Sequence, residues 1–159
     1  DVLVIFLPLF GQENNLSPIV IGTILAIRSG ASMFSRLFLG ELSRRFGSKR
    51  IMILSGFVAT ITIGSLILTT NVLIIEAIIL VAGFALGIGQ PLTMAWVSLA
   101  SAPEERGMAI SLRLTGNRVG QFILPVGAGL VAGSMGVSSV FLGLAGLLAA
   151  STLVSNRYE

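Results

Sequence analysis

The stretch GELSRRFGSKR, residues 40–50, is a short basic connection between two long apolar segments. Its glycines have predictable uses, since Gly40 would let neighbouring helices approach closely and Gly47 would permit a tight turn. Cations in short connections mark the cytoplasmic side of a membrane protein, so the stretch also predicts how the flanking segments are oriented. It contains four of the ten Lys and Arg residues of the chain: Arg44, Arg45, Lys49 and Arg50.

The rest of the chain has the composition of a membrane protein. Hydrophobic residues make up 54% and charged residues 11%, with a mean hydropathy of +0.97, whereas soluble domains are about 25% charged. Most of its apolar segments approach the ~20 residues that a helix needs to cross the hydrocarbon core. We therefore predict an all-α polytopic membrane protein, with residues 1–159 forming one six-helix transmembrane bundle. The six segments cover residues 2–10, 18–40, 51–68, 72–99, 108–131 and 137–154.

If residues 40–50 lie in the cytoplasm, every Lys and Arg outside the apolar segments lies on the cytoplasmic side. The opposite connections, GQENNLS, TTN and GSMGVSS, contain no Lys or Arg. This bias predicts a cytoplasmic C-terminus. The cytoplasmic side would then hold Arg44, Arg45, Lys49, Arg50, Arg106 and Arg157.

The connection SAPEERG carries helix-start signals. Ser101 can cap a helix and Pro103 suits a first turn. Glu104 and Glu105 would interact favourably with the positive end of the helix dipole. We expect the fifth helix to begin near Pro103.

Several function classes are disfavoured by residues that the chain lacks. It has no cysteine and no histidine, and Asp1 is its only aspartate. Thiolate, imidazole and paired-aspartate sites are therefore absent, so we expect no enzyme, no metal site and no bound cofactor. The basic residues are few and lie mostly at segment ends rather than in one patch, so no nucleic-acid partner is expected. The lipid bilayer is the expected environment.

The first apolar segment is too short to cross a bilayer. Its nine residues would extend about 15 Å as a helix, roughly half of the hydrocarbon core. The chain starts at Asp1 with neither methionine nor a signal-peptide pattern. We expect a truncated first helix, and the alternative is a re-entrant or interfacial segment.

Residues 40–50 resemble the loop motif G-x-L-(A/S)-D-R-x-G-(R/K)-(R/K)-(R/K) of the major facilitator superfamily. In that family the motif lies between the second and third helices of each six-helix half. Arg44 and Ser48 depart from the motif, and loss of its aspartate is commoner in C-terminal halves. The resemblance implies a C-terminal half whose N-terminal six-helix half is missing. The matching residues are Gly40, Leu42, Ser43, Arg45, Gly47, Lys49 and Arg50.

A second resemblance lies in GQFILPVGAG, residues 120–129. It looks like the G-x-x-x-G-P-x-x-G-G motif of proton-coupled antiporters, matching at Gly120, Pro125 and Gly129 but departing at Leu124 and Ala128. We expect these three residues to serve helix packing. The runs GFALGIGQPLTMAW and PEERGMAISLRLTGNRVGQ are similar to a little-characterised bacterial branch of the family, which implies a bacterial inner membrane.

The family resemblance implies a secondary transporter whose two halves rock about a central site. The substrate would be a small solute, and efflux driven by a proton gradient is one form that family analogy suggests. The alternative is a passive channel or a six-helix scaffold acting as a dimer.

Polar residues within the apolar segments are the candidates for a transport pathway. Arg28 and Arg118 would each lie about 15 Å deep, where a charge should face protein or water. Arg36 and Arg113 are shallower and are expected to extend towards the headgroups. Helical spacing places Ser32 near Arg28, and Asn117 and Gln121 near Arg118, while Gln90 and Thr93 flank Pro91. The candidates are Arg28, Ser32, Gln90, Thr93, Asn117, Arg118 and Gln121.

These arginines have no obvious carboxylate partner, because Glu76, near the outer interface, is the only acid within a segment. They could pair with carboxylates of the missing half, attract an anionic substrate, or bond to polar groups of the bundle. Three glycine pairs are expected at helix contacts: Gly83 and Gly87, Gly116 and Gly120, and Gly129 and Gly133.

Overall fold

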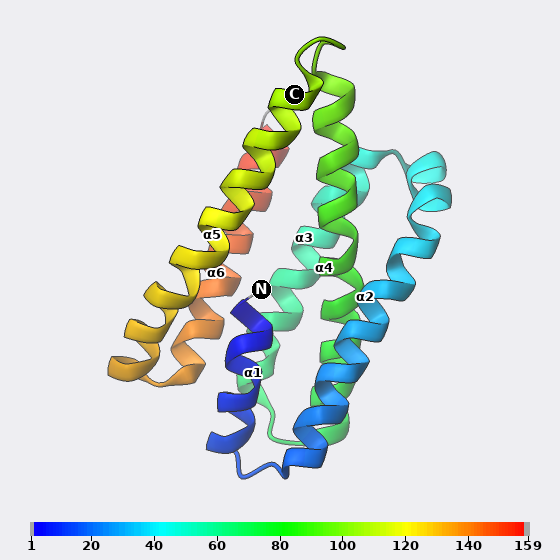
Figure 1. Cartoon of the computed structure of the whole chain (residues 1–159). Helices are drawn as coiled ribbons and strands as arrows, with labels where there is room; N and C mark the ends of the chain where they lie inside the picture. Colours follow the sequence, from blue (N-terminus) through cyan, green and yellow to red (C-terminus); the bar gives the residue numbers. More distant parts are fainter. Residues whose placement is uncertain (1, 158–159) are drawn as a thin grey trace.

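The computed structural model describes residues 2–157, with side chains for residues 4–154, and this part is entirely helical apart from its connections. The all-α class is thereby confirmed. Its elements (Figure 1) are α1 (Val2–Glu13), α2 (Pro18–Phe46), α3 (Ser48–Ser65), the 3-10 turn η1 (Leu66–Leu68), α4 (Val72–Ala100), α5 (Arg106–Met135) and α6 (Val137–Arg157).

Among the described residues, four helices are long and apolar enough to cross a membrane: α2, α3 with η1, α4 and α6. The helix α1 is too short for this criterion, and α5 does not meet it. The chain is therefore an integral membrane protein by these helices, whereas membrane crossing by α1 and α5 remains a prediction.

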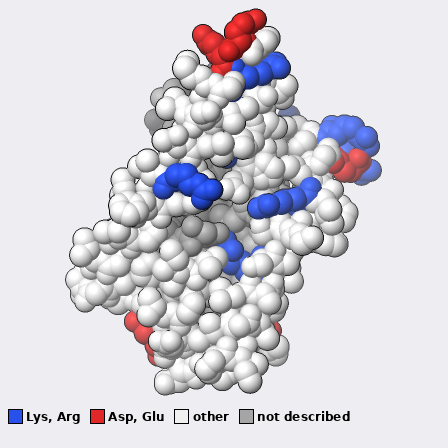
Figure 2. All heavy atoms as spheres, viewed as in Figure 1, with Lys and Arg blue, Asp and Glu red and all other residues white. Residues whose placement is uncertain are grey.

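The helices run alternately up and down (Figure 1). The α2–α3 turn and the α4–α5 connection lie at the upper end, and the other connections lie at the lower end. Figure 2 shows basic side chains at the upper end and in the middle of the same face. The basic connections thus share one end of the bundle, as the sequence predicted, while the side of the membrane remains a prediction.

The hydrophobic core lies where five helices meet, and α4 is central to it. The helix α4 packs against α2 and α3, and α3 packs against α6. Ile24 of α2, Ile63 of α3 and Ile79 of α4 are buried in one cluster. The rings of Phe10 and Phe141 join α1 to α6 through an edge-to-face contact with centroids 5.3 Å apart. The helix α5, in contrast, has no buried residue in the described structure.

The contact between α2 and α4 depends on two glycines of α4. A Cβ at Gly83 would lie 2.7 Å from the carbonyl oxygen of Arg28, and one at Gly87 would lie 2.7 Å from the Cα of Ser32. Only glycine permits so close an approach, so the expectation for this glycine pair is confirmed.

The glycines of α5 are different, because they face open space. No described atom lies within 4 Å of a Cβ built at any of its four predicted contact glycines: Gly116, Gly120, Gly129 and Gly133. The packing role predicted for Pro125 stays a prediction. Helix packing at the glycines, including the motif residues Gly120 and Gly129, is not realised between α5 and the rest of the described chain. It remains a prediction for a neighbour of α5.

The α2–α3 connection is tighter than the sequence indicated. The apolar segment ends near Gly40, but α2 continues to Phe46 because Glu41 forms ion pairs with Arg44 and Arg45 along the helix surface. Gly47 alone joins the helices, with φ +81°, which confirms its predicted role in a tight turn. The expectation for Gly40 is not met, since no described atom lies within 4 Å of a Cβ built there.

The expected start of α5 near Pro103 was wrong. Residues 103–105 form a turn, in which the Glu105 N–H donates to the Ala102 carbonyl over 3.0 Å, and α5 begins at Arg106. The Ser101 hydroxyl donates to the Val97 carbonyl over 2.7 Å, so it satisfies the end of α4 rather than the start of α5. Serine can serve either helix end, and spacing alone did not distinguish the two uses.

Candidate functional site

A cavity of about 440 Å³ lies between α2, α4 and α5 and is closed behind by α3 and α6. Figure 2 shows basic side chains in the middle of the face that carries α2 and α5. The polar lining comes from three helices that are distant in sequence: Arg28, Ser32 and Arg36 of α2, Gln90 of α4, and Asn117 and Gln121 of α5.

Five of the seven residues predicted for the pathway line this one cavity: Arg28, Ser32, Gln90, Asn117 and Gln121. The α2 residues are held in place by the glycine contacts with α4 described above, because Gly83 lies against the backbone of Arg28 and Gly87 against that of Ser32. Arg28 is 7% exposed. The tight α2–α4 contact thus fixes the depth of a cation within the bundle.

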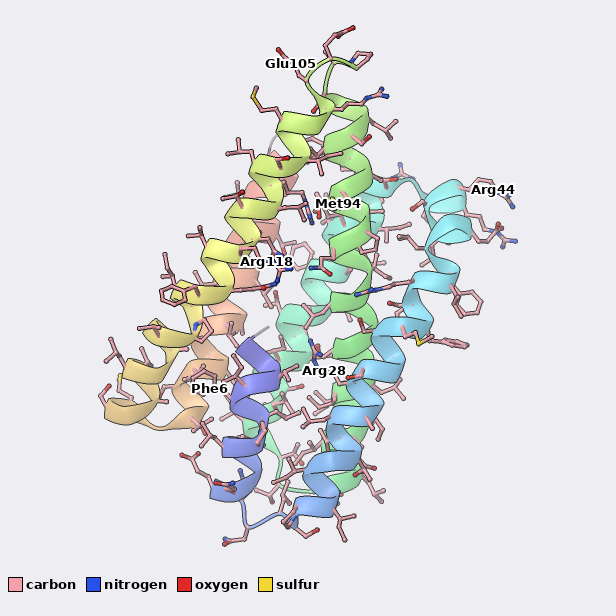
Figure 3. All side chains as sticks on the ribbon, in the orientation of Figure 1. Phe6, Arg28, Arg44, Met94, Glu105 and Arg118 are labelled. Carbon is pink, nitrogen blue, oxygen red and sulfur yellow. The ribbon has the colours of Figure 1, made fainter. Side chains whose placement is uncertain are left out.

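Arg118 lies beside the cavity rather than in its lining. Its side chain is exposed, and Nη1 donates a 3.2 Å hydrogen bond to Oε1 of Gln121 one turn along α5. Figure 3 shows Arg118 on the side of α5 that faces α4, above the level of Arg28. Gln121 therefore connects Arg118 to the cavity wall.

Arg113 binds α4 instead of extending towards the headgroups, so that expectation was wrong. It donates to the carbonyl oxygen of Gln90 over 3.1 Å and to the hydroxyl of Thr93. Thr93 donates in turn to the carbonyl of Gly89 over 2.9 Å. Buried cations often bond to backbone carbonyls, and the turn of α4 around Pro91 lies within reach of Arg113.

Thr93 belongs to a second cavity, of about 220 Å³, between α3, α4 and α6. The Thr93 hydroxyl accepts a hydrogen bond from Arg113, which links α4 to α5. Thr93 is not among the described residues that line the main cavity.

Arg36 was not among the predicted pathway residues, yet it lines the main cavity from its exposed position on α2. The sequence did indicate this position, because Arg28, Ser32 and Arg36 are four residues apart and therefore lie on one face of the helix. Apolar residues complete the lining and had no sequence signal that distinguishes them from core residues: Ile63, Leu86, Leu124, Leu144 and Leu148.

The described lining of the main cavity contains no carboxylate. Glu76 of α4 accepts a 3.2 Å hydrogen bond from Thr23, which lies five residues before Arg28 on α2, about one and a half helical turns. Arg36, exposed at the cavity, therefore contributes a positive potential there. Among the described residues, no group of three or more acidic side chains could hold a metal ion.

The loop-motif residues at the α2–α3 turn have distinct structural positions. Leu42 packs against a small cluster that includes Ile51 and Leu92, and the Ser43 carbonyl accepts a 3.1 Å hydrogen bond from the N–H of Gly47. Arg45 pairs with Glu41. The motif thus ends α2, reverses the chain and begins α3 within a few residues, leaving Lys49 and Arg50 exposed at the start of α3.

Comparisons with known proteins agree with this architecture. The family model described as Major Facilitator Superfamily matches residues 1–157. A protein named "Multi-drug resistance efflux pump PmrA homolog", from Lactococcus lactis subsp. lactis (strain IL1403), is 29% identical over 154 residues. The match covers 94% of this chain and 38% of that relative. No solved structure matches the chain significantly. Because the family model matches almost all of the sequence, the chain belongs to the Major Facilitator Superfamily, a family of membrane transporters.

Proposed function

We propose that this chain is one six-helix half of a secondary transporter that moves a small solute by alternating access. The observation that carries the proposal is the cavity, where polar residues of α2, α4 and α5 converge in an otherwise apolar bundle. Transporters built from repeated halves bind their substrates near the bilayer midplane between the halves. The cavity would supply one side of such a site.

A second six-helix half on the N-terminal side would supply the other side. The match to 38% of a longer relative supports this arrangement. The helix α5 supports it as well, because it has open glycines and no buried residue, as suits a helix that packs against a further partner. Arg44, at the acidic position of the loop motif, favours the C-terminal half. The Lys and Arg bias favours a cytoplasmic C-terminus, in the inner membrane of a bacterium.

An anionic solute is the substrate class that the cavity favours. Arg36 lines the cavity from an exposed position on α2, and the described lining carries no carboxylate. The relative's name supports export as the direction, by analogy alone. If protons drive transport, the protonatable carboxylate would belong to the other half.

Transport by the complete protein in sealed liposomes tests the proposal. Two fluorescent probes separate the substrate classes: carboxyfluorescein is an organic anion and ethidium is an organic cation. We expect saturable carboxyfluorescein flux that responds to an imposed proton gradient. Arg36→Gln should reduce this flux, and Arg106→Gln, at the first residue of α5 and outside the described cavity lining, serves as the matched control.

The outcomes separate the alternatives. Flux that neither saturates nor responds to a gradient would indicate a passive channel. Saturable flux of ethidium but not of carboxyfluorescein would retain the transporter and reject the anionic class. Absence of any flux from well-folded protein, with both probes, would favour a scaffold.

A further inference from the structure

Another cavity, distinct from the two described above, lies away from the proposed transport site, on the side of the bundle formed by α2, α3 and α4. It is a groove of about 540 Å³ beginning at the α2–α3 turn. Ile51 and Ile88 are buried at its floor, whereas Leu54 and Val81 on its sides are 65% and 42% exposed. The groove is therefore open and apolar along its length.

In the described lining of the groove, polar side chains come from two residues. Ser55 donates its hydroxyl hydrogen to the carbonyl of Met52 over 2.9 Å, so its side chain is already bonded within α3. Arg50 lies in the first turn of α3 and adds an exposed cation where the groove begins. The described lining includes no acidic residue.

The surroundings of Arg50 reinforce its positive charge. Glu41 is the only acid in residues 40–50, and it forms ion pairs with both Arg44 and Arg45. Lys49 is exposed next to Arg50. Both cations stand at the N-terminal end of α3, where the helix dipole also favours an anion. The groove thus combines an apolar channel with an electropositive entrance.

The groove runs along the bundle axis. From Ile51 to Val58, the α3 wall extends about 10 Å, and from Leu80 to Ile88 the α4 wall extends about 12 Å at the α-helical rise. This direction is the one that an acyl chain follows in a bilayer. The cationic entrance lies at the end of the bundle, where headgroups would lie.

We propose that this groove binds an anionic glycerophospholipid. One acyl chain would lie against Leu54, Val81 and Phe84, and the phosphate would bond to Arg50 with Lys49 beside it. A zwitterionic lipid such as phosphatidylethanolamine would use the apolar walls equally well and also carries a phosphate, but its ammonium group would offset the attraction of the headgroup to the two cations. The site is independent of the proposed transport cavity, since the described linings of the two have no residue in common.

Native mass spectrometry of the complete protein, titrated in detergent with phosphatidylglycerol or phosphatidylethanolamine, tests the site. Phosphatidylglycerol should bind more tightly, and Arg50→Gln should weaken its binding about five-fold, the factor for one basic residue near an anionic headgroup. Arg106→Gln should leave phosphatidylglycerol binding unchanged. Leu54→Trp should fill the groove and reduce the binding of both lipids, and the exposure of Leu54 makes this variant compatible with folding.

Four results would overturn the proposal. Equal losses for Arg50→Gln and Arg106→Gln would indicate general surface attraction. Equal affinity for the two lipids would reject headgroup selection, and unchanged binding to Leu54→Trp would place the lipid elsewhere. A change of oligomeric state in Leu54→Trp, with no lipid bound to the unsubstituted protein, would identify the groove as a protein interface.

Discussion

Replacing Gly87 by alanine should force α2 and α4 apart. A Cβ at this position would lie 2.7 Å from the Cα of Ser32 and 2.8 Å from its carbonyl oxygen. Ordinary contacts begin at 3.4 Å, so the backbone of α2 would have to retreat by about 0.7 Å, which is 3.4 minus 2.7 Å. Backbone atoms cannot rotate away as a flexible side chain can, and such overpacking costs about 1–3 kcal/mol.

Gly89→Ala provides the matched control for this substitution. Gly89 lies two residues further along α4, and no described atom lies within 4 Å of a Cβ built there. Both substitutions replace a helical glycine by alanine, so the change in intrinsic helix propensity is common to the two variants and cancels in the comparison. The free energy of unfolding of Gly87→Ala should therefore be lower than that of Gly89→Ala by about 1–3 kcal/mol.

Unfolding of the complete protein by SDS in mixed micelles, followed by far-ultraviolet circular dichroism, measures this difference. Gly87→Ala should unfold at a lower SDS fraction than Gly89→Ala. Equal unfolding of the two variants would refute the close α2–α4 contact. It would also remove the reason for the buried position of Arg28, whose backbone lies one turn below the same contact.

Three further predictions concern arginines of α5 and the α2–α3 turn. Arg118→Gln should impair transport while leaving folding and membrane insertion intact, and unchanged flux in liposomes would exclude Arg118 from the pathway. Arg113→Gln should affect flux less but should loosen α5 from α4, lowering the unfolding free energy by about 0.6–1.7 kcal/mol, as for other interhelical hydrogen bonds in membranes; a larger loss of specific transport than in Arg118→Gln would reverse this ranking. Gly47→Ala should destabilise the protein by about 1–3 kcal/mol because its backbone, with φ +81° and ψ 139°, is unfavourable for a residue with a Cβ. Gly40→Ala, in open space, is its control, and equal stability of these two variants would contradict the strained turn.

The helices could be predicted from the sequence because hydrophobic length and polar punctuation are local properties. Boundaries were less accurate where a residue can serve two structures, as Ser101 does, or where ion pairs prolong a helix beyond its apolar part, as around Glu41. Gly47 was predictable because a sharp reversal between two helices demands its conformational freedom.

The cavity could be predicted only in part. Helical spacing identified polar stripes on α2 and α5, but it does not give the rotation of one helix relative to another. That rotation brings Arg28, Gln90 and Gln121 to one cavity and directs Arg113 onto α4. The same limit applies to glycine pairs, since the spacing of Gly83 and Gly87 is identical to that of Gly116 and Gly120, yet only the first pair meets another helix.

The exposed character of α5 has a consequence for biosynthesis. Its 30 residues would extend about 45 Å, more than enough to span a bilayer, but an arginine within an inserting helix is unfavourable, and the cost reaches about 2.5–3.5 kcal/mol at the helix centre. The helix α4 precedes α5 in the chain, so the Gln90 carbonyl and Thr93 hydroxyl that bind Arg113 are already made when α5 leaves the ribosome. We therefore expect α4 and α5 to enter the membrane as a hairpin, with α4 acting as an internal insertion partner for its polar successor.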